Sequence, residues 1–252
     1  MKIKKIFMII AGIVLITSCQ PPAGNTAHVK GSLTGALGLK LTLQEMDTRE
    51  IHAIDSVILD NSGQFEFNPV IHETGFWLLK APSGKILVLM LYAGDQIDLT
   101  GSVVDFPDHV ILKGPEEAMM LNDFYRHTRL KEKQVDSLEM IIADRQDSSD
   151  YYQVTQKLDT SFKQIWENQR KDEMAFINKH PGSLASLLVL NYAFGMSPVL
   201  SPEEDFMYYH KLDSALNDKF PENKHVKFHR QRVLEIKRNI STQADPRQTP
   251  HK

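Results

Sequence analysis

The sequence contains one cysteine, Cys19, and two tryptophans, Trp77 and Trp166. A single cysteine excludes a Cys-x-x-Cys pair, the usual redox centre of thiol-disulfide oxidoreductases. Neither tryptophan starts a Trp-Cys-x-x-Cys motif, because leucine follows Trp77 and glutamate follows Trp166. The chain therefore lacks the residues that thiol-disulfide exchange requires.

The sequence also lacks a hydrophobic run long enough to cross a membrane, which takes about 20 residues. The apolar run 6–16 is shorter and follows a segment with three lysines and no acid, as in a signal peptide. Ile16-Thr17-Ser18-Cys19 then resembles the lipobox of bacterial lipoproteins. We therefore expect residues 1–18 to be a cleaved signal peptide, Cys19 to carry the lipid that anchors the chain to the membrane, and residues 19–26 to form a flexible tether.

The chain has little excess charge. Its formal net charge is −3, and loss of the three signal-peptide lysines makes the mature chain more acidic. We expect no nucleic-acid partner, because that affinity depends on neutralising phosphates. Residues 221–252 differ, with eight Lys or Arg against three acids. This segment is a candidate contact for anionic lipid headgroups, although the sequence favours a solvated helix face.

Residues 27–113 show the pattern of a β-rich domain. Short apolar or alternating runs recur about every ten residues, with turn residues between them. Eight runs are predicted as strands: 29–33, 40–46, 56–60, 64–68, 75–81, 86–92, 96–100 and 109–113. We expect an antiparallel β-sandwich or barrel. Alternation in 64–67 predicts one buried face, and the apolar run 86–91 predicts a central strand buried on both sides.

Residues 114–240 predict an α-helical region of about five helices. The expected helices begin near 115, 151, 184, 202 and 224, and the second of them runs to Lys179. The third should extend to Phe194, and Ser201 before Pro202 is a start signal for the fourth. Residues 241–252 are polar, contain two prolines and are expected to be disordered. The fold class is therefore α+β with segregated halves.

Several short motifs are similar to a known family. They include the G-x-F-x-F run 63–67, the A-G-D turn 93–95 and His180-Pro181-Gly182-Ser183. Over residues 27–240 the chain resembles the β-rich domain of unknown function, with its helical extension, at the front of thioredoxin-like lipoproteins of the Bacteroides group. These motifs are structural: Gly63 suits a turn with positive φ, and Phe65 and Phe67 suit a core face.

The resemblance implies a thiol-disulfide oxidoreductase domain of the peroxiredoxin or cytochrome-maturation type after the last helix. Twelve polar residues stand there instead, so the redox activity of the family is not carried over. Bacteroides-group lipoproteins destined for the cell surface have acidic residues just after the lipid-bearing cysteine, and residues 20–25 contain none. We therefore expect the chain to face the periplasm, anchored in the outer rather than the inner membrane.

Ten histidines prompt a search for a metal site. His225 and His229 lie four residues apart on the last predicted helix, a spacing that can hold one ion. Four basic residues around them would repel a cation: Lys224, Lys227, Arg230 and Arg232. Four further histidines are scattered through the β-rich half and are expected at the surface or in turns: His28, His52, His72 and His109. We expect no metal site and no cofactor.

Other candidate motifs have structural interpretations. The glycine-rich segment 31–38 lacks the Lys-Ser/Thr pair of a phosphate loop and is interpreted as a hairpin. Ser83 lies in a Pro-Ser-Gly turn rather than in a Gly-x-Ser-x-Gly elbow. Three Asp-Ser-aliphatic or Asp-Ser-Ala tripeptides resemble the periplasmic O-glycosylation acceptor of the Bacteroides group, although so short a pattern also arises by chance. Their serines are Ser56, Ser137 and Ser214.

These patterns predict a non-catalytic cell-envelope lipoprotein that acts as an interaction or accessory module. The alternative is an accessory subunit of a thiol-disulfide system that works beside a separate thioredoxin-like protein. An enzyme would require a deep pocket with convergent titratable groups. Apolar residues on the helices predict that the face formed by residues 184–240 contacts a second protein or a second copy.

Overall fold

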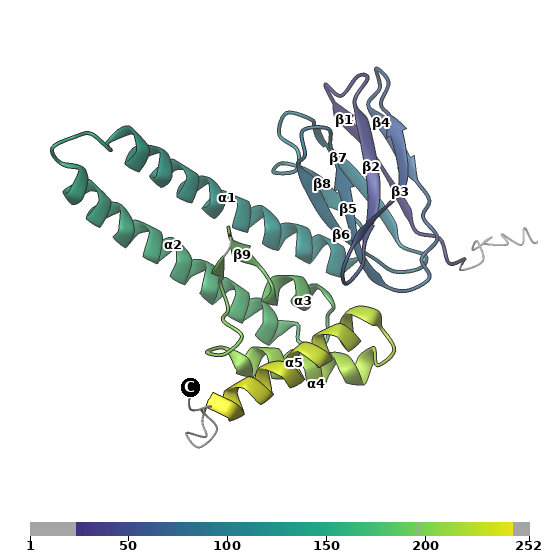
Figure 1. The fold of residues 1–252 in the computed structure, drawn as a ribbon. Coiled ribbons are helices and arrows are strands. Elements are labelled where there is room, and N and C mark those ends of the chain that lie inside the picture. The colour runs from purple at the N-terminus through teal and green to yellow at the C-terminus, as the bar shows by residue number, and fades with distance from the viewer. Residues whose placement is uncertain (1–23, 196, 244–252) are drawn as a thin grey trace, which may run out of the picture.

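The computed structural model describes residues 24–195 and 197–243. Figure 1 shows a β-sandwich beside a separate group of helices, with a long helical hairpin projecting from the body. The predicted α+β class is confirmed. Within the described residues, the eight strands of the β-rich half form two four-stranded sheets that do not close into a barrel, and five helices follow.

The first sheet has the strand order β4-β1-β7-β8. Its strands are β1 (His28–Thr34), β4 (Gln64–Phe67), β7 (Gln96–Ser102) and β8 (Ile111–Lys113). β1 and β7 are parallel, which corrects the expectation of a purely antiparallel sandwich. Both strands start at the same end of the sheet, where the His28 N–H donates to the Asp95 carbonyl at 2.8 Å.

The second sheet has the order β3-β2-β5-β6 and is antiparallel throughout. Its strands are β2 (Lys40–Met46), β3 (Ile51–Ile58), β5 (Gly75–Lys80) and β6 (Ile86–Leu91). The prediction that 86–91 is a central strand is wrong, because β6 lies at the edge of the sheet. It is apolar because the first helix packs against it. The strand in the interior of the sheet, buried on both faces, is β5.

The glycine-rich segment after β1 is a connection between the sheets rather than a hairpin. β1 and β2 do not pair with each other, and the turn between them carries the chain from the first sheet to the second. Gly35 and Gly38 both have φ near +73°, a conformation that favours glycine.

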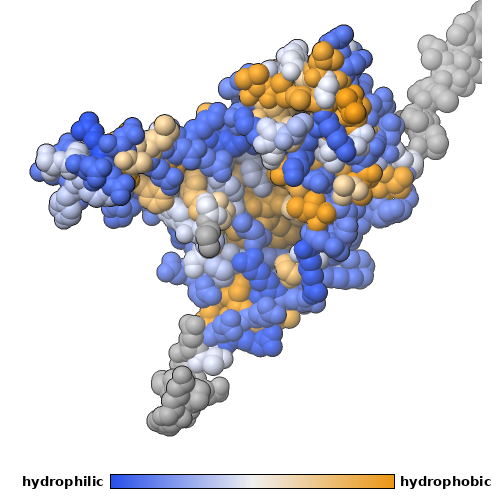
Figure 2. All heavy atoms as spheres, turned by 45° about the horizontal axis from the view of Figure 1, so that its top comes forward, coloured by the Kyte–Doolittle hydropathy of each residue, from blue (hydrophilic) through white to orange (hydrophobic). Residues whose placement is uncertain are grey.

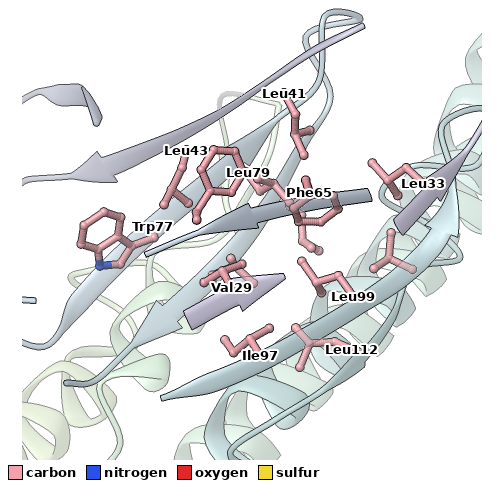
Figure 3. Close-up of a cluster of buried hydrophobic side chains, with 14 of the residues drawn as sticks. Val29, Leu33, Leu41, Leu43, Phe65, Trp77, Leu79, Ile97, Leu99 and Leu112 are labelled. Carbon is pink, nitrogen blue, oxygen red and sulfur yellow. The ribbon is translucent and has the colours of Figure 1, made fainter. Parts of the chain in front are cut away.

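The core of the sandwich lies between the two sheets (Figure 3). Leu41, Leu43 and Leu79 from the second sheet meet Val29 and Leu99 from the first, and all five are buried. Each such side chain contributes about 1.5–3 kcal/mol by leaving water.

The G-x-F-x-F run behaves as predicted. Phe65 and Phe67 are buried, and Gly63 has φ +63°. A Cβ at Gly63 would lie 2.1 Å from the Leu33 carbonyl oxygen, so this turn has no room for a larger residue.

Helices α1 (Glu116–Asp144) and α2 (Tyr151–Lys179) form the projecting hairpin (Figure 1). The buried residues of α1 end at Thr128, and those of α2 begin at Gln169. Glu132 and Lys133 still bond to Tyr192 and Asp108, so the part of the hairpin that contacts little besides itself lies beyond these residues. Three large side chains are exposed on the two helices: Leu130, Ile141 and Tyr152.

The remaining elements are α3 (Ala185–Leu190), β9 (Ala193–Phe194), β10 (Ser197–Pro198), α4 (Phe206–Lys219) and α5 (Lys224–Gln243). The expectation that α3 extends to Phe194 is wrong. The Asn191 side chain donates to the Leu187 carbonyl at 2.6 Å and ends the helix. The chain then forms β9, where Phe194 packs on Trp166 with ring centroids 5.7 Å apart.

Helix α4 begins later than the Ser201-Pro202 signal predicts. The Asp205 carboxylate accepts the Ser201 N–H at 2.8 Å and pairs with Arg170, which makes 201–205 a separate turn. At the other end of the region, α5 continues to Gln243, so the first three residues of the expected disordered segment are helical. Residues 244–252 lie outside the described part.

The predicted signal peptide, Cys19 and most of the predicted tether also lie outside the described residues. The last residues of the predicted tether are attached to the fold rather than free. Thr26 forms a β-bridge with Val70, and the Ile71 N–H donates to the Asn25 carbonyl at 2.5 Å. In the described part of the chain, none of the helices combines the length and the apolar character that crossing a membrane requires.

Candidate binding site at the junction of the sandwich and the helices

The start of α5 is attached to the end of the sandwich where β5 begins. Asn223 caps the helix, because its Oδ1 accepts the N–H groups of His225 at 3.0 Å and Val226 at 3.4 Å. Its Nδ2 donates to the Thr74 carbonyl at 2.7 Å, one residue before β5. One side chain thus caps the helix and joins it to the sheet.

Ion pairs reinforce this attachment. The Lys224 ammonium lies 2.7 Å from Glu45 Oε1 and 3.2 Å from Asp47 Oδ2, at the end of β2 and in the turn after it. The Lys224 N–H also donates to Glu73 Oε1 at 2.9 Å. The Thr48 N–H and the Lys224 ammonium lower the pKa of Asp47 below its ordinary value. The position of α5 relative to β2 and β5 is therefore defined by several polar contacts.

A pocket of about 240 Å³ lies next to this attachment, between the sandwich, α3 and α5. Its apolar wall combines both halves of the molecule: Met46, Phe76, Leu187, Leu188 and Phe228. Its polar lining consists of Asp47, Thr48, Asn191, His225, His229 and Arg232. Figure 2 shows hydrophobic side chains gathered in the hollow between the hairpin, the sandwich and the C-terminal helices.

The two histidines of the pocket are buried rather than surrounded by solvent and cations. His229 Nε2 lies 3.0 Å from the Tyr209 carbonyl, to which it donates when it carries the proton. Burial lowers the pKa of His229. His225 packs on Phe76 with ring centroids 4.6 Å apart, and burial, aided by the Lys224 charge, lowers the pKa of His225 to about 4. Both rings are therefore neutral at pH 7.

Helical spacing explains this burial. His229 lies three residues after Val226, four before Val233 and seven before Ile236, all of which are buried on the same side of α5. The basic neighbours of the histidines in the sequence lie on other sides of the helix. A helical projection of 224–240 would have revealed the buried histidines, whereas counting neighbouring charges did not.

His225 Nε2 is buried with no hydrogen-bond partner among the described residues, whereas Arg232 and Asn191 are engaged within the fold. The Arg232 guanidinium donates to Asn191 Oδ1 and lies 5.5 Å from the centroid of the Tyr209 ring. Asn191 Nδ2 is used to end α3. What the pocket offers to another molecule is therefore its apolar wall, including Phe228, which is 42 % exposed.

A second polar cluster lies at the base of the helical hairpin. Glu173 is fully buried and accepts a hydrogen bond from Gln169 Nε2 at 3.0 Å, while its Oε2 has no partner among the described residues. Gln169 Oε1 accepts from Lys131 Nζ at 2.9 Å. Burial raises the pKa of Glu173 to about 8, against the opposing effects of Gln169 and Lys131. This carboxyl is a structural group inside the helices rather than part of the pocket.

The structure does not bring the other predicted site residues together. Ser56, Ser137 and Ser214 are exposed on β3, α1 and α4 respectively. The four histidines of the β-rich half are not buried. Across residues 24–195 and 197–243, no three or more His, Cys, Asp or Glu side chains lie together as a metal site would require.

Comparison with known proteins finds no family model and no curated protein that matches the chain. One of the solved structures is similar to part of it, a 9R-lipoxygenase from Cyanothece PCC8801. The two are 10 % identical, and the match covers 68 % of this chain and 32 % of the lipoxygenase chain with a TM-score of 0.23. The chain thus spans about a third of that protein, and a likeness at this level carries no functional argument.

Proposed function

We propose that the chain is a non-catalytic lipoprotein of the cell envelope, anchored through Cys19 and facing the periplasm, that binds a partner protein at the junction pocket. One observation carries the proposal. Most polar groups of the pocket bond within the fold, and His225 Nε2, which has no partner among the described residues, is buried, whereas the apolar side chain of Phe228 remains exposed to another molecule.

The size of the pocket supports a protein partner. Sites for drug-sized ligands and cofactors usually enclose about 300–1,000 Å³, and this pocket encloses about 240 Å³. A pocket of this size suits one large side chain from another protein. Such anchor side chains contribute much of the binding energy at protein interfaces.

The chemistry of the pocket supports binding rather than catalysis. A general base must reach a proton of a bound substrate. Here Lys224 is held by two carboxylates, His229 faces a backbone carbonyl, and the unpartnered His225 Nε2 is buried against the start of β5. The carboxyl whose pKa burial raises to about 8, Glu173, belongs to the buried cluster of the hairpin and does not line the pocket.

The proposal is tested by placing a photo-reactive phenylalanine analogue at Phe228 and cross-linking in whole cells. We expect a discrete adduct with one periplasmic protein. The matched control carries the analogue at Met207, which is more exposed but lies on α4, outside the pocket. The control should give no adduct.

A second substitution tests whether the pocket itself is used. Leu188→Ser removes part of the apolar wall, and loss of an anchor contact worth about 2 kcal/mol should lower the adduct yield about 30-fold. Thermal melting must first show that the variant is folded. An unchanged yield from folded Leu188→Ser, or equal adducts at positions 228 and 207, would contradict the proposal. A thioredoxin-like protein as the partner would assign the chain to a thiol-disulfide system.

A further inference from the structure

Helix α5 has an unusual charge for this protein. Six of its residues are Lys or Arg and one is acidic, whereas the whole chain has a formal net charge of −3. The helix therefore concentrates positive charge in one part of an otherwise acidic molecule.

Four of these cations share one side of the helix. Val226, His229, Val233 and Ile236 form the buried side. With 3.6 residues per turn, a stripe of cations lies on the exposed side next to the buried one: Lys227, Arg230, Lys237 and Arg238. Leu234 lies within this basic stripe and is 52 % exposed. Cations beside an exposed apolar side chain are typical of helices that rest on membrane surfaces.

The stripe is little used within the fold. Lys224 and Arg232 are engaged elsewhere and lie outside it. Lys227 pairs with Glu222 at 2.7 Å, but both groups are exposed, so the pair is weak. Within residues 24–195 and 197–243, no carboxylate pairs with Arg230, Lys237 or Arg238.

The chain enters the fold close to the start of α5. Asn25 is hydrogen-bonded to Ile71, and Thr74, three residues later, is bonded to the helix cap Asn223. The six residues from Cys19 to Asn25 span at most about 20 Å when extended. A lipid on Cys19 thus keeps this end of the molecule, and with it the first turns of α5, close to the bilayer surface.

We propose that the basic stripe of α5 binds the anionic phospholipid headgroups of the membrane that holds the lipid anchor. The inference rests on the proposed lipid anchoring. The cations meet headgroup phosphates, and Leu234 enters the interfacial region. A contact of this kind fixes which side of the molecule faces the bilayer and leaves the projecting hairpin directed away from the anchor.

The test uses residues 20–252, which contain the complete described fold but no lipid, and measures co-sedimentation with vesicles. Vesicles of phosphatidylcholine with 25 mol % phosphatidylglycerol, chosen to supply anionic headgroups, are compared with vesicles of pure phosphatidylcholine. We expect binding to the anionic vesicles only. Each cation near an anionic surface contributes about a fivefold change in partitioning. The triple variant Lys227→Gln, Arg230→Gln and Arg238→Gln should therefore bind about 100-fold more weakly.

The matched control is Lys157→Gln, Lys163→Gln and Lys171→Gln, which removes the same charge from exposed positions on α2. It should bind nearly as well as the parent. The inference would be overturned if both triple variants lost vesicle binding equally, or if the parent bound neutral and anionic vesicles equally. It would also be overturned if the parent bound a nucleic acid more tightly than anionic vesicles at the same concentration of negative charge. Because the protein tested carries no lipid, its result is independent of whether Cys19 is lipidated in cells.

Discussion

The buried carboxyl of Glu173 should make the protein less stable as the pH rises, and Glu173→Gln should remove that effect. The pKa of Glu173 is raised to about 8 by burial in the folded protein, whereas an unfolded glutamate titrates near 4.5. The folded state therefore binds the proton more tightly. Its contribution to stability is fully present below pH 4.5 and is lost as the pH rises toward 8.

The magnitude follows from these two values. One pKa unit corresponds to about 1.4 kcal/mol. Between pH 5 and pH 8.5, ionisation of Glu173 should lower the free energy of unfolding by about 4 kcal/mol. Glutamine has nearly the shape of the protonated carboxyl and does not ionise. It can still accept the hydrogen bond from Gln169, and its amide replaces an oxygen, Oε2, that has no described partner.

Urea denaturation followed by circular dichroism measures this effect. We expect Glu173→Gln and the parent to have similar stability at pH 5, and the variant to be more stable by at least about 2 kcal/mol at pH 8.5. The control is Asp172→Asn, which removes a carboxylate that is more than half exposed and pairs with Lys131. It should change stability by less than about 1 kcal/mol at either pH. A Glu173→Gln variant with the pH dependence of the parent would refute the reasoning.

Three other predictions concern the anchor and the junction. Cys19→Ser should abolish lipidation and move the protein out of the membrane fraction, and a variant that stays membrane-bound and matured at residue 19 would contradict the anchor. Asn223→Ala should lower the free energy of unfolding by about 1–2 kcal/mol through loss of the helix cap, whereas Asn239→Ala, on the exposed side of α5, should leave thermal melting unchanged. The pKa of His225 is lowered to about 4 by burial, so its contribution to stability is lost as the pH falls from 6.5 toward 4, by about 3 kcal/mol. His225→Asn should flatten the acid side of the stability profile, and an unchanged acid slope would show that this ring is not the group responsible.

Local patterns were sufficient to predict most elements of the fold, although the strand expected at 56–60 occupies 51–58. Helix α2 occupies 151–179 as expected, because apolar periodicity and flanking turn residues are properties of the segment itself. The alternating strand 64–67 buries the predicted face for the same reason. The parallel pairing of β1 and β7 depends on residues more than 60 positions apart, and no local pattern records it.

The candidate site was less accessible to sequence reasoning. The segment 184–240 does contribute most of the pocket, but the pocket also needs Met46 and Phe76 from the sandwich. Only the docking of α5 through Asn223 and Lys224 brings these residues together. The apolar run 86–91 was misplaced for a related reason: burial by a helix and burial by a neighbouring strand select the same residues.

The projecting hairpin has a consequence for how the molecule opens. Beyond Lys133, which still pairs with Asp108 of the sandwich, the last 11 residues of α1 extend about 16 Å alongside α2. Segments with few buried contacts open locally at a lower free energy than the rest of a protein. Amide hydrogens should therefore exchange fastest near the tip and progressively more slowly toward Thr128, while those of β5 exchange only by global unfolding. A protease should nick the connection at 145–150 and leave the sandwich and C-terminal helices intact, which would make the hairpin a separate cooperative unit of the same chain.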